Sequence, residues 1–279
     1  EPDNAQRPIV NGQWSPPVLP EKIIGDYETI VAKDPDRPVF LNLGQGVAWN
    51  NYIGRGVRRN HPEDYREYAR GGDIVSFDIY PVTHHNEQIK GNLWYVARGV
   101  ERLRRWTDYR KIVWNCIETT KIRAPRRATP HELRAEVWMS IIHGSGGIIY
   151  FVHEWEPEVD TRRLLHDPGM LLAVTDVNHR IHDLAPVLNS GTFYYAAEAT
   201  SSRPDVPVDV MVKRYGGATY VFSVAMRDAA TNVSFLVAAV PEQAIARVIG
   251  ENRSVTVEKG AFQDHFEPYD VHIYRIEQD

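Results

Sequence analysis

Glu118 is the residue of this sequence best placed to do chemistry. It lies near the end of the segment Lys111 to Thr120, KIVWNCIETT, an apolar run that ends in a carboxylate and two hydroxyls. Such a run is typical of a strand buried on both faces of a parallel sheet. Because closed α/β barrels place their chemistry at the carboxyl ends of the strands, Glu118 is a candidate catalytic group. The alternatives are that it caps the next loop or pairs with an arginine such as Arg123.

Three further segments predict strands whose carboxyl ends also bear polar or aromatic side chains. They are Pro38 to Leu43, Asp73 to Val82 and Ile148 to Trp155. The residues of interest at or just after their ends are Asn42, Gln45, Asp78, Tyr80, His153 and Trp155. Side chains two positions apart share one face of a strand, so Asp78 and Tyr80 share a face, and Cys116 and Glu118 do so on their own strand.

Helices are predicted between these strands from apolar stripes at helical spacing. The expected ranges are 20–32, 62–69, 92–103, 130–142 and 167–184. Asn60 with Glu63 resembles a capping box at the second of these helices, and Thr129 with Glu132 forms one at the fourth. The alternation of strand and helix is typical of a parallel sheet wound with helices, an α/β fold.

The pattern changes at about Leu188. Alternating segments at 208–215 and 218–226 flank Gly216-Gly217, which predicts a two-residue hairpin. Segments 232–240, 254–258 and 270–276 continue in the same style. We therefore expect two domains, residues 1–187 and an antiparallel β-domain at 188–279, which either supports the first domain or binds carbohydrate.

Composition excludes several classes of function. The net charge of −5 argues against a nucleic-acid surface. Cys116 is the single cysteine, so no disulfide can form within the chain. The sequence contains no run of about 18 apolar residues, and no membrane partner is expected. The chain opens on Glu1 rather than methionine, and we expect an upstream segment.

Metal and nucleotide chemistry are not favoured either. The spacing of His84, His85, His143 and His153 matches no zinc pattern, and supporting or sugar-contact roles are favoured for them. No glycine-rich phosphate loop precedes a helix in the required context. We therefore expect neither a metal nor a cofactor.

These strand ends, together with the opening Glu1-Pro2, resemble the retaining (β/α)8-barrel glycoside hydrolases. That clan has its acid/base glutamate after strand 4, typically in an Asn-Glu-Pro motif, and its nucleophile after strand 7. If Glu1 ends strand 4, the strands that follow are strands 5 to 8, and Glu118 ends strand 7. The resemblance covers about residues 1–187, although the loop GQGVAWN after Leu43 departs from the pattern. It implies a TIM-type barrel, continued here by a small antiparallel β-sandwich at 188–279.

The resemblance also implies roles for individual residues. Glu1 would be the acid/base and Glu118 the nucleophile, held by a hydrogen bond from Tyr80, while Trp155 would form a platform under the sugar. The other expected substrate contacts are His153, Asp78, Trp49, Gln45, Asn42 and His84. Retention requires two carboxyl groups about 5 to 5.5 Å apart, which two strand-end glutamates can provide.

The implied function is the hydrolysis of a β-linked oligo- or polysaccharide, in a protein whose upstream segment supplies barrel strands 1 to 4. For a glycosidase of this kind we expect a secreted or periplasmic location. The alternative is a glycan-binding protein that has lost catalysis on a barrel scaffold.

Two arginine clusters follow the expected strands 5 and 7. They comprise Arg55, Arg58 and Arg59, and Arg123, Arg126 and Arg127. Arginine suits bidentate recognition of carboxylate or sulfate, so the clusters could indicate an anionic substrate. The alternative is ordinary pairing with acidic residues of the protein itself.

Overall fold

The computed structural model describes residues 1–6, 14–122 and 126–278. The chain divides into two compact units that interleave along the sequence. The first comprises residues 1–81, 95–118 and 143–151, and the second comprises residues 82–94, 119–142 and 152–279. The domain boundary expected at residue 187 stays a prediction.

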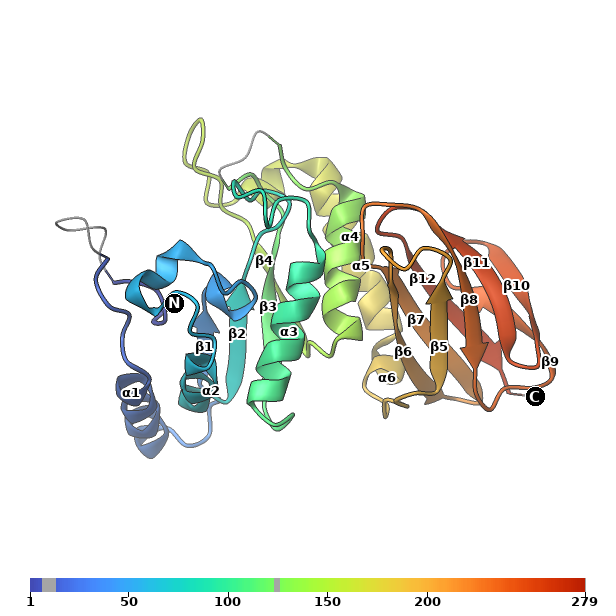
Figure 1. The fold of residues 1–279 in the computed structure, drawn as a ribbon, viewed down its shortest axis with the longest axis horizontal. Helices are drawn as coiled ribbons and strands as arrows, with labels where there is room; N and C mark the ends of the chain where they lie inside the picture. The colour runs from blue at the N-terminus through green and yellow to red at the C-terminus, as the bar shows by residue number, and fades with distance from the viewer. Residues whose placement is uncertain (7–13, 123–125, 279) are drawn as a thin grey trace. The chain divides into compact units, whose positions relative to one another are not determined.

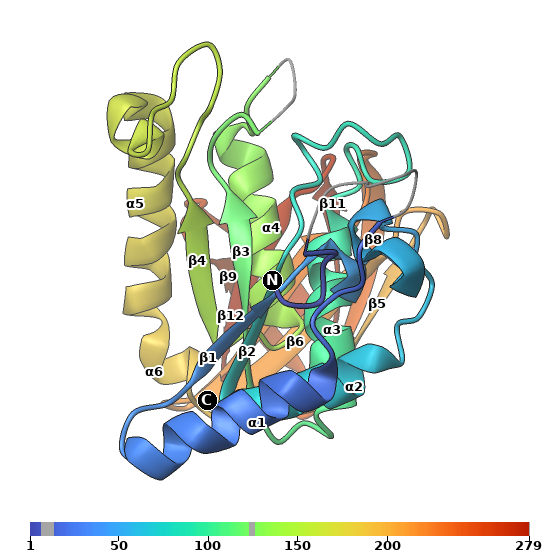
Figure 2. The same ribbon diagram turned by 90° about the vertical axis from the view of Figure 1, so that its left-hand side faces the viewer.

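A parallel sheet forms the centre of the first unit. Its strands are β1 (Phe40–Leu43), β2 (Ile74–Asp78), β3 (Ile112–Glu118) and β4 (Gly147–Phe151). They pair in the order β1-β2-β3-β4, all parallel, as Figure 2 shows. The expectation of a parallel α/β sheet built from these four segments is confirmed.

One face of this sheet packs against helix α3 (Trp94–Trp106). Phe77 of β2 is fully buried and lies against Gly99, where an added Cβ would come within 2.2 Å of the phenyl ring. Glycine is therefore needed at this position for the helix to approach the strand so closely. The opposite face of the sheet presents Asn42, Ser76 and Asp78, which is unusual for the buried face of a parallel sheet.

The remaining elements of the first unit are short, apart from its first helix. They are α1 (Pro20–Lys33), the 3-10 helices η1 (Gln45–Val47), η2 (Ile53–Arg58) and η3 (Ala69–Gly71), and α2 (Asp64–Tyr68). Helix α1 begins at Pro20, as predicted. The capping box predicted at Asn60 is wrong, because Asn60 has a φ of 63° and α2 begins four residues later with no side-chain cap from Glu63.

Two strands are shorter than predicted. Strand β2 ends at Asp78, before Pro81, whose missing N–H cannot join a ladder. Strand β4 ends at Phe151, and the backbone of Glu154 instead exchanges two hydrogen bonds with Asp160. Tyr80 and Trp155 therefore lie in loops that follow the strands rather than at the last strand residue.

The helices of the second unit are α4 (Pro130–Ile142), η4 (Arg163–His166), α5 (Pro168–Asp183) and α6 (Ala185–Leu188). The capping box of α4 is confirmed. The Thr129 N–H donates to Glu132 Oε2 over 2.9 Å, and the Glu132 N–H donates to Thr129 Oγ1 over 3.2 Å. Asp167 caps α5 by accepting a hydrogen bond from the Met170 N–H. None of the helices in the described part of the chain has the length and apolar character needed to cross a bilayer.

The second unit also contains the antiparallel sheet (Figure 1). Its strands are β5 (Ala197–Ser201), β6 (Val208–Tyr215), β7 (Ala218–Ala225), β8 (Thr231–Val237), β9 (Gln243–Val248), β10 (Arg253–Glu258), β11 (Ala261–Phe266) and β12 (Val271–Glu277). The hairpin predicted between β6 and β7 is confirmed, since Gly216 and Gly217 have φ values of 56° and 75°. Both values lie in the left-handed region that a type I′ turn requires.

The eight strands form one continuous sheet in the order β5-β8-β11-β10-β9-β12-β7-β6. Its strands contribute to a single core in which Phe235 stacks on Phe262 at 4.7 Å. The sheet therefore curls around its own core, and the expected layout of two separate facing sheets is not shown. Phe222, on the other face of β7, stacks on Trp138 of α4 at 5.7 Å, which explains why β7 is buried on both faces.

Candidate functional site

The polar face of the parallel sheet gathers candidate residues through strand register alone. Asn42 of β1 is paired with Ser76 of β2, and Asp78 is paired with Cys116 of β3. Residues paired in a parallel sheet point to the same side, so these side chains form two successive rows. The next row, toward the carboxyl ends of the strands, contains Glu118.

Three polar atoms on this face lack partners. Asn42 Oδ1, Ser76 Oγ and Asp78 Oδ1 are buried and have no oxygen or nitrogen hydrogen-bond partner within the described residues, and the only polar contact of the Ser76 hydroxyl is with the Cys116 thiol. Buried polar atoms are almost always hydrogen-bonded, because an unmade bond costs about 1–3 kcal/mol. Three such atoms on adjacent strands indicate a place where a polar ligand or water belongs.

Asp78 links this row to Glu1 and Tyr80. Burial raises the pKa of Asp78 well above its ordinary value, and a hydrogen bond to the Glu1 carboxylate adds to the effect. Asp78 therefore keeps a proton at pH values where an exposed aspartate has lost it, and donates that proton to Glu1. The Tyr80 hydroxyl is hydrogen-bonded to the carboxyl group of Asp78, and burial raises the pKa of Tyr80. Burial and the proximity of Asp78 also raise the pKa of the Cys116 thiol to about 12.

Asp3 fixes the segment that bears Glu1. Its buried carboxylate accepts hydrogen bonds from the Gly44 N–H over 2.9 Å and from the Tyr65 hydroxyl over 2.7 Å. The Arg55 guanidinium donates to the Asp3 carbonyl oxygen over 2.8 Å. Glu1 itself is exposed and accepts a hydrogen bond from Asn4. Sequence reasoning missed Asp3, since its partners are distant in sequence; the one available signal was an acidic residue two positions after Glu1.

Glu118 is the last residue of β3 and is fully buried. It is paired in register with Phe151, whose ring lies 5.0 Å from that of Tyr80. The loop residue Tyr80 is therefore close to the end of β3. The hydrogen bond expected from Tyr80 to Glu118 stays a prediction, and Arg123, the alternative partner of Glu118, lies outside the described residues.

His84, His153 and Trp155 belong to the second unit. His84 is buried and accepts a hydrogen bond from the Asn86 N–H over 3.0 Å. Burial and the neighbouring His85 lower the pKa of His84 to about 4, so the imidazole is neutral at physiological pH. The rings of His153 and Trp155 meet edge to face at 6.3 Å, and Trp155 is 47% exposed. An exposed indole beside an imidazole can offer a face to a sugar.

Glu154 is a buried residue that sequence reasoning missed. It accepts two hydrogen bonds from the Arg127 guanidinium, at 2.7 and 2.5 Å, and a third from the Lys121 N–H at 3.1 Å. The Thr120 hydroxyl donates to the His153 carbonyl oxygen over 2.6 Å. These contacts fasten the loop that bears His153 and Trp155 to the segment that follows Glu118 in sequence.

The arginine clusters pair with acidic groups of the protein. Asp64 binds both Arg55 and Arg58, while Arg126 binds Glu132. Arg127 binds Glu154, and Arg59 makes a long hydrogen bond to Asn51. Since four of the five described arginines are in ion pairs within the protein, they do not support an anionic substrate. Arg123 lies outside the described residues.

Trp49 and Gln45 occupy the loop after β1. Trp49 is only 5% exposed and its ring lies 5.9 Å from that of Tyr52, which leaves little of the indole for a ligand. Gln45 begins η1 and is half-buried. Arg102 donates to the Val47 carbonyl oxygen over 2.9 Å and fixes this loop to α3. Among the described residues, no group of three or more His, Cys, Asp or Glu side chains is arranged to hold a metal ion.

No protein-family model matches the sequence, and a search of the curated proteins found no match either. The fold is nevertheless similar to those of solved glycoside hydrolases. An Anoxybacillus alpha-amylase aligns with a TM-score of 0.60 at 13% identity, over 94% of this chain and 57% of its own. The GH42 exo-carrageenase from Bacteroides ovatus aligns with a TM-score of 0.56 at 11% identity, over 93% and 55%.

The noncanonic maltogenic alpha-amylase AmyB from Thermotoga neapolitana aligns with a TM-score of 0.52 at 10% identity, over 91% of this chain and 58% of its own. At such identities the likeness shows a shared fold and no more. The chain spans little more than half the length of these structures.

Proposed function

We propose that this chain is part of a glycoside hydrolase that cleaves a β-linked oligo- or polysaccharide by a retaining, double-displacement mechanism. The observation that carries the proposal is the row of unpartnered buried polar atoms on Asn42, Ser76 and Asp78, beside the Glu1–Asp78 carboxyl pair. Sugar hydroxyls are suitable partners for such atoms. Glycosidic cleavage also needs a protonated carboxyl group beside the leaving oxygen, and this pair holds a proton.

The roles follow from the chemistry. In the first step a proton passes from Glu1 to the glycosidic oxygen, the Glu118 carboxylate attacks the anomeric carbon, and the alcohol leaves. In the second step Glu1 takes a proton from water, whose oxygen displaces Glu118 from the sugar. Asp78 is hydrogen-bonded to Glu1 and keeps a proton in the pair, so its role is to position and protonate the acid/base.

The substrate contacts are proposals as well. Asn42, Ser76 and Tyr80 would bind hydroxyls near the reacting sugar, while Trp155 and His153 would contact a sugar face from their loop. His84 is a further candidate, because its neutral imidazole can donate and accept. Gln45 is retained as a contact of the loop after β1, whereas the burial of Trp49 favours a packing role.

The other part of the barrel is proposed to come from an upstream segment. In the described part of the chain, β1 and β4 are the edge strands of the parallel sheet. Every residue of β4 is only partly buried, although the four residues that follow Gly147 are all apolar or aromatic. Strands 1 to 4 of a closed barrel would pair with both edges and cover these residues.

Two variants of the protein with its upstream segment test the assignment on an activated aryl β-glycoside. Glu118→Gln should abolish turnover. Glu1→Ala should still cleave a substrate with a good leaving group, accumulate the glycosyl-enzyme, and form a β-azide when azide is added. Full activity of Glu118→Gln, or an inverted product from the unmodified enzyme, would refute the proposal.

A further inference from the structure

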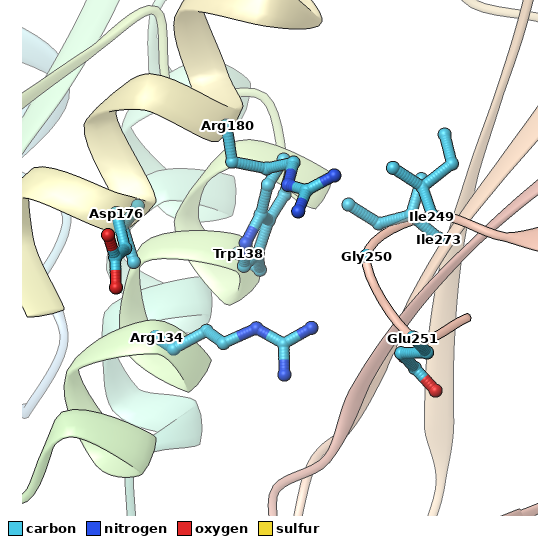
Figure 3. A pocket seen from close by; sticks show the side chains of 9 residues that line it. Arg134, Trp138, Asp176, Arg180, Ile249, Gly250, Glu251 and Ile273 are labelled. Atoms are coloured by element: carbon cyan, nitrogen blue, oxygen red, sulfur yellow. The ribbon is translucent and has the colours of Figure 1, made fainter.

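A cavity of about 220 Å³ lies within the second unit. None of the residues that line it is assigned to the proposed glycosidase chemistry. Arg134 and Trp138 of α4, Arg180 of α5, and the turn 249–251 between β9 and β10 line it (Figure 3). Figure 3 shows both guanidinium groups extending from their helices toward this turn. The volume is below the range of about 300–1,000 Å³ typical of drug-sized ligands, so the cavity suits a small ligand.

Arg180 is seated against Gly250. Gly250 has a φ of 85°, and a Cβ added there would lie 2.5 Å from Arg180 Nη2. The turn thus needs glycine both for its backbone conformation and to admit the guanidinium. Within residues 1–6, 14–122 and 126–278, no hydrogen bond or ion pair of the Arg180 side chain is formed.

Arg134 is similarly short of a counter-ion. Its guanidinium donates one hydrogen bond, to the Val271 carbonyl oxygen over 2.8 Å, and it forms no ion pair with a carboxylate of the described residues. Burial lowers the pKa of Arg134, and the positive charge of Arg180 adds to this effect, against the opposing influence of Glu251 and Asp270. Two neighbouring guanidinium groups therefore remain with most of their donors unused.

The acidic residues of the lining do not neutralise this pair. Glu251 is bound to His272 Nδ1 over 2.6 Å and to Arg253 Nε over 2.8 Å. In Figure 3 the Asp176 carboxylate lies beside α5, well to the left of both guanidinium groups. The cavity therefore combines two fixed cations, a buried indole wall and a small volume.

We propose that this cavity binds an oxyanion between the guanidinium groups of Arg134 and Arg180. The ligand class is a carboxylate, sulfate or phosphate group, each of which accepts the paired N–H donors that arginine presents in one plane. The bound anion joins α4 and α5 to the β9–β10 turn. It therefore stabilises the second unit by an amount that grows with the logarithm of the anion concentration above its Kd.

The test is calorimetric titration of the protein with sodium sulfate, sodium phosphate and sodium glucuronate, at an ionic strength held constant with chloride. Saturable binding of at least one of the three anions is expected. The anion that binds shows whether the site takes a sulfate, a phosphate or a carboxylate group. Arg180→Gln should weaken this binding by about tenfold or more, as expected for a lost charge-assisted hydrogen-bond pair. This variant is preferred because the Arg180 side chain makes no bond that folding needs.

Arg162→Gln is the matched control, since it removes one exposed arginine charge from the same unit. Its affinity for the anion should equal that of the wild type. Arg134→Lys keeps the charge but loses the planar pair of donors, and should also bind weakly. Absence of binding in all three arms, or equal affinity in wild type and Arg180→Gln, would overturn the proposal. The calorimetric measurement does not depend on glycoside cleavage, so its outcome is independent of the proposed enzymatic function.

Discussion

Glu1 and Asp78 place two carboxyl groups in direct contact, and only one of them is buried. Burial and the negative charge of Glu1 raise the pKa of Asp78, so the pair retains one proton between its two members. A proton held beside an exposed carboxylate is what a general acid needs at neutral pH. The contact therefore has a measurable consequence for both stability and activity.

The first prediction concerns the pH dependence of stability. A carboxyl group whose pKa is raised above the 3.8 of an exposed aspartate contributes most to stability below that value and loses its contribution as the pH rises through the folded-state pKa. As the pH rises from about 4 to about 8, the free energy of unfolding of the wild type should fall relative to that of Asp78→Asn.

Urea unfolding at several pH values measures this difference. Asp36→Asn, at an exposed position of the same unit, is the control and should follow the wild-type pH profile. Parallel profiles for the wild type and Asp78→Asn would contradict the proposed shift.

The second prediction concerns Asp3. Asp3→Ala leaves the Tyr65 hydroxyl and the Gly44 N–H without their buried acceptor, which should cost about 1–3 kcal/mol of stability for each group left unpaired. It should also release the segment that bears Glu1, so kcat on an aryl glycoside should fall more than stability alone explains. Thermal unfolding and kinetics below the unfolding range check both effects. Unchanged kcat would show that Asp3 does not position Glu1.

At the scale of single residues, the alternation of side chains along a strand allowed the sequence to predict which residues share a face. It placed Cys116 with Glu118 on one face of β3, but the face it expected Asp78 and Tyr80 to share does not exist as such, because β2 ends at Asp78. It could not identify Asp3 or Glu154, because their burial depends on Tyr65, Gly44 and Arg127, all far away in sequence. For Arg55 the sequence left open an anionic substrate or an acidic partner, since nothing local reveals that Asp64 and the Asp3 carbonyl enclose it.

At the scale of secondary structure, capping shows why one helix start was predicted and another was not. Thr129 and Glu132 form their reciprocal bonds because Pro130 fixes the backbone of the first helical turn. Asn60 instead adopts a left-handed conformation, for which asparagine is well suited, and the helix begins only at Asp64. Thr129 thus caps a helix, whereas Asn60, also of a type that favours helix caps, forms a turn.

The third prediction tests the cap of α4. Thr129→Ala removes the acceptor of the Glu132 N–H and should lower the free energy of unfolding by about 0.5–2 kcal/mol. Thr129→Ser retains the hydroxyl and should restore most of the loss. Chemical denaturation of the two variants measures the difference. Equal stability of the alanine and serine variants would show that the hydroxyl makes no net contribution.

The fourth prediction concerns the loop with His153 and Trp155. Arg127→Met leaves the buried Glu154 carboxylate with its backbone donor and the more distant Arg163, whose Nε lies 4.0 Å away. The change should cost about 1–3 kcal/mol, because Arg127 is partly solvated. Hydrogen exchange should increase in the loop 152–160. Arg66→Met removes an exposed ion pair and should change neither quantity measurably. Unchanged exchange in Arg127→Met would contradict the fastening role of this pair.

At the scale of the whole molecule, apolar surface remains exposed around the parallel sheet. Helix α1 has an apolar stripe yet no buried residue, and Phe40 of β1 is 42% exposed. Strand β4 is only partly buried along its length. Sequence periodicity predicted these elements correctly, but it could not show what covers them, since that depends on residues beyond the elements themselves.

The fifth prediction follows from this exposure. When the proposed upstream segment is present, the backbone amides of 40–43 and 147–151 should exchange with deuterium more slowly than in residues 1–279 alone, because new strands pair with both edges. Exchange of the β6–β7 hairpin should be the same in both proteins and serves as the internal control. Equal exchange at the two edges would contradict the proposed completion of the barrel.

In the proposed mechanism Glu118 attacks the anomeric carbon. Treatment of the protein that includes its upstream segment with a 2-deoxy-2-fluoro β-glycoside bearing a good leaving group should trap the glycosyl-enzyme, because fluorine slows its hydrolysis more than the leaving group slows its formation. Peptide mass spectrometry should then find the fluorosugar on Glu118, and none in Glu118→Gln. A label on another residue, or turnover with an inverted product and no covalent species, would contradict the account.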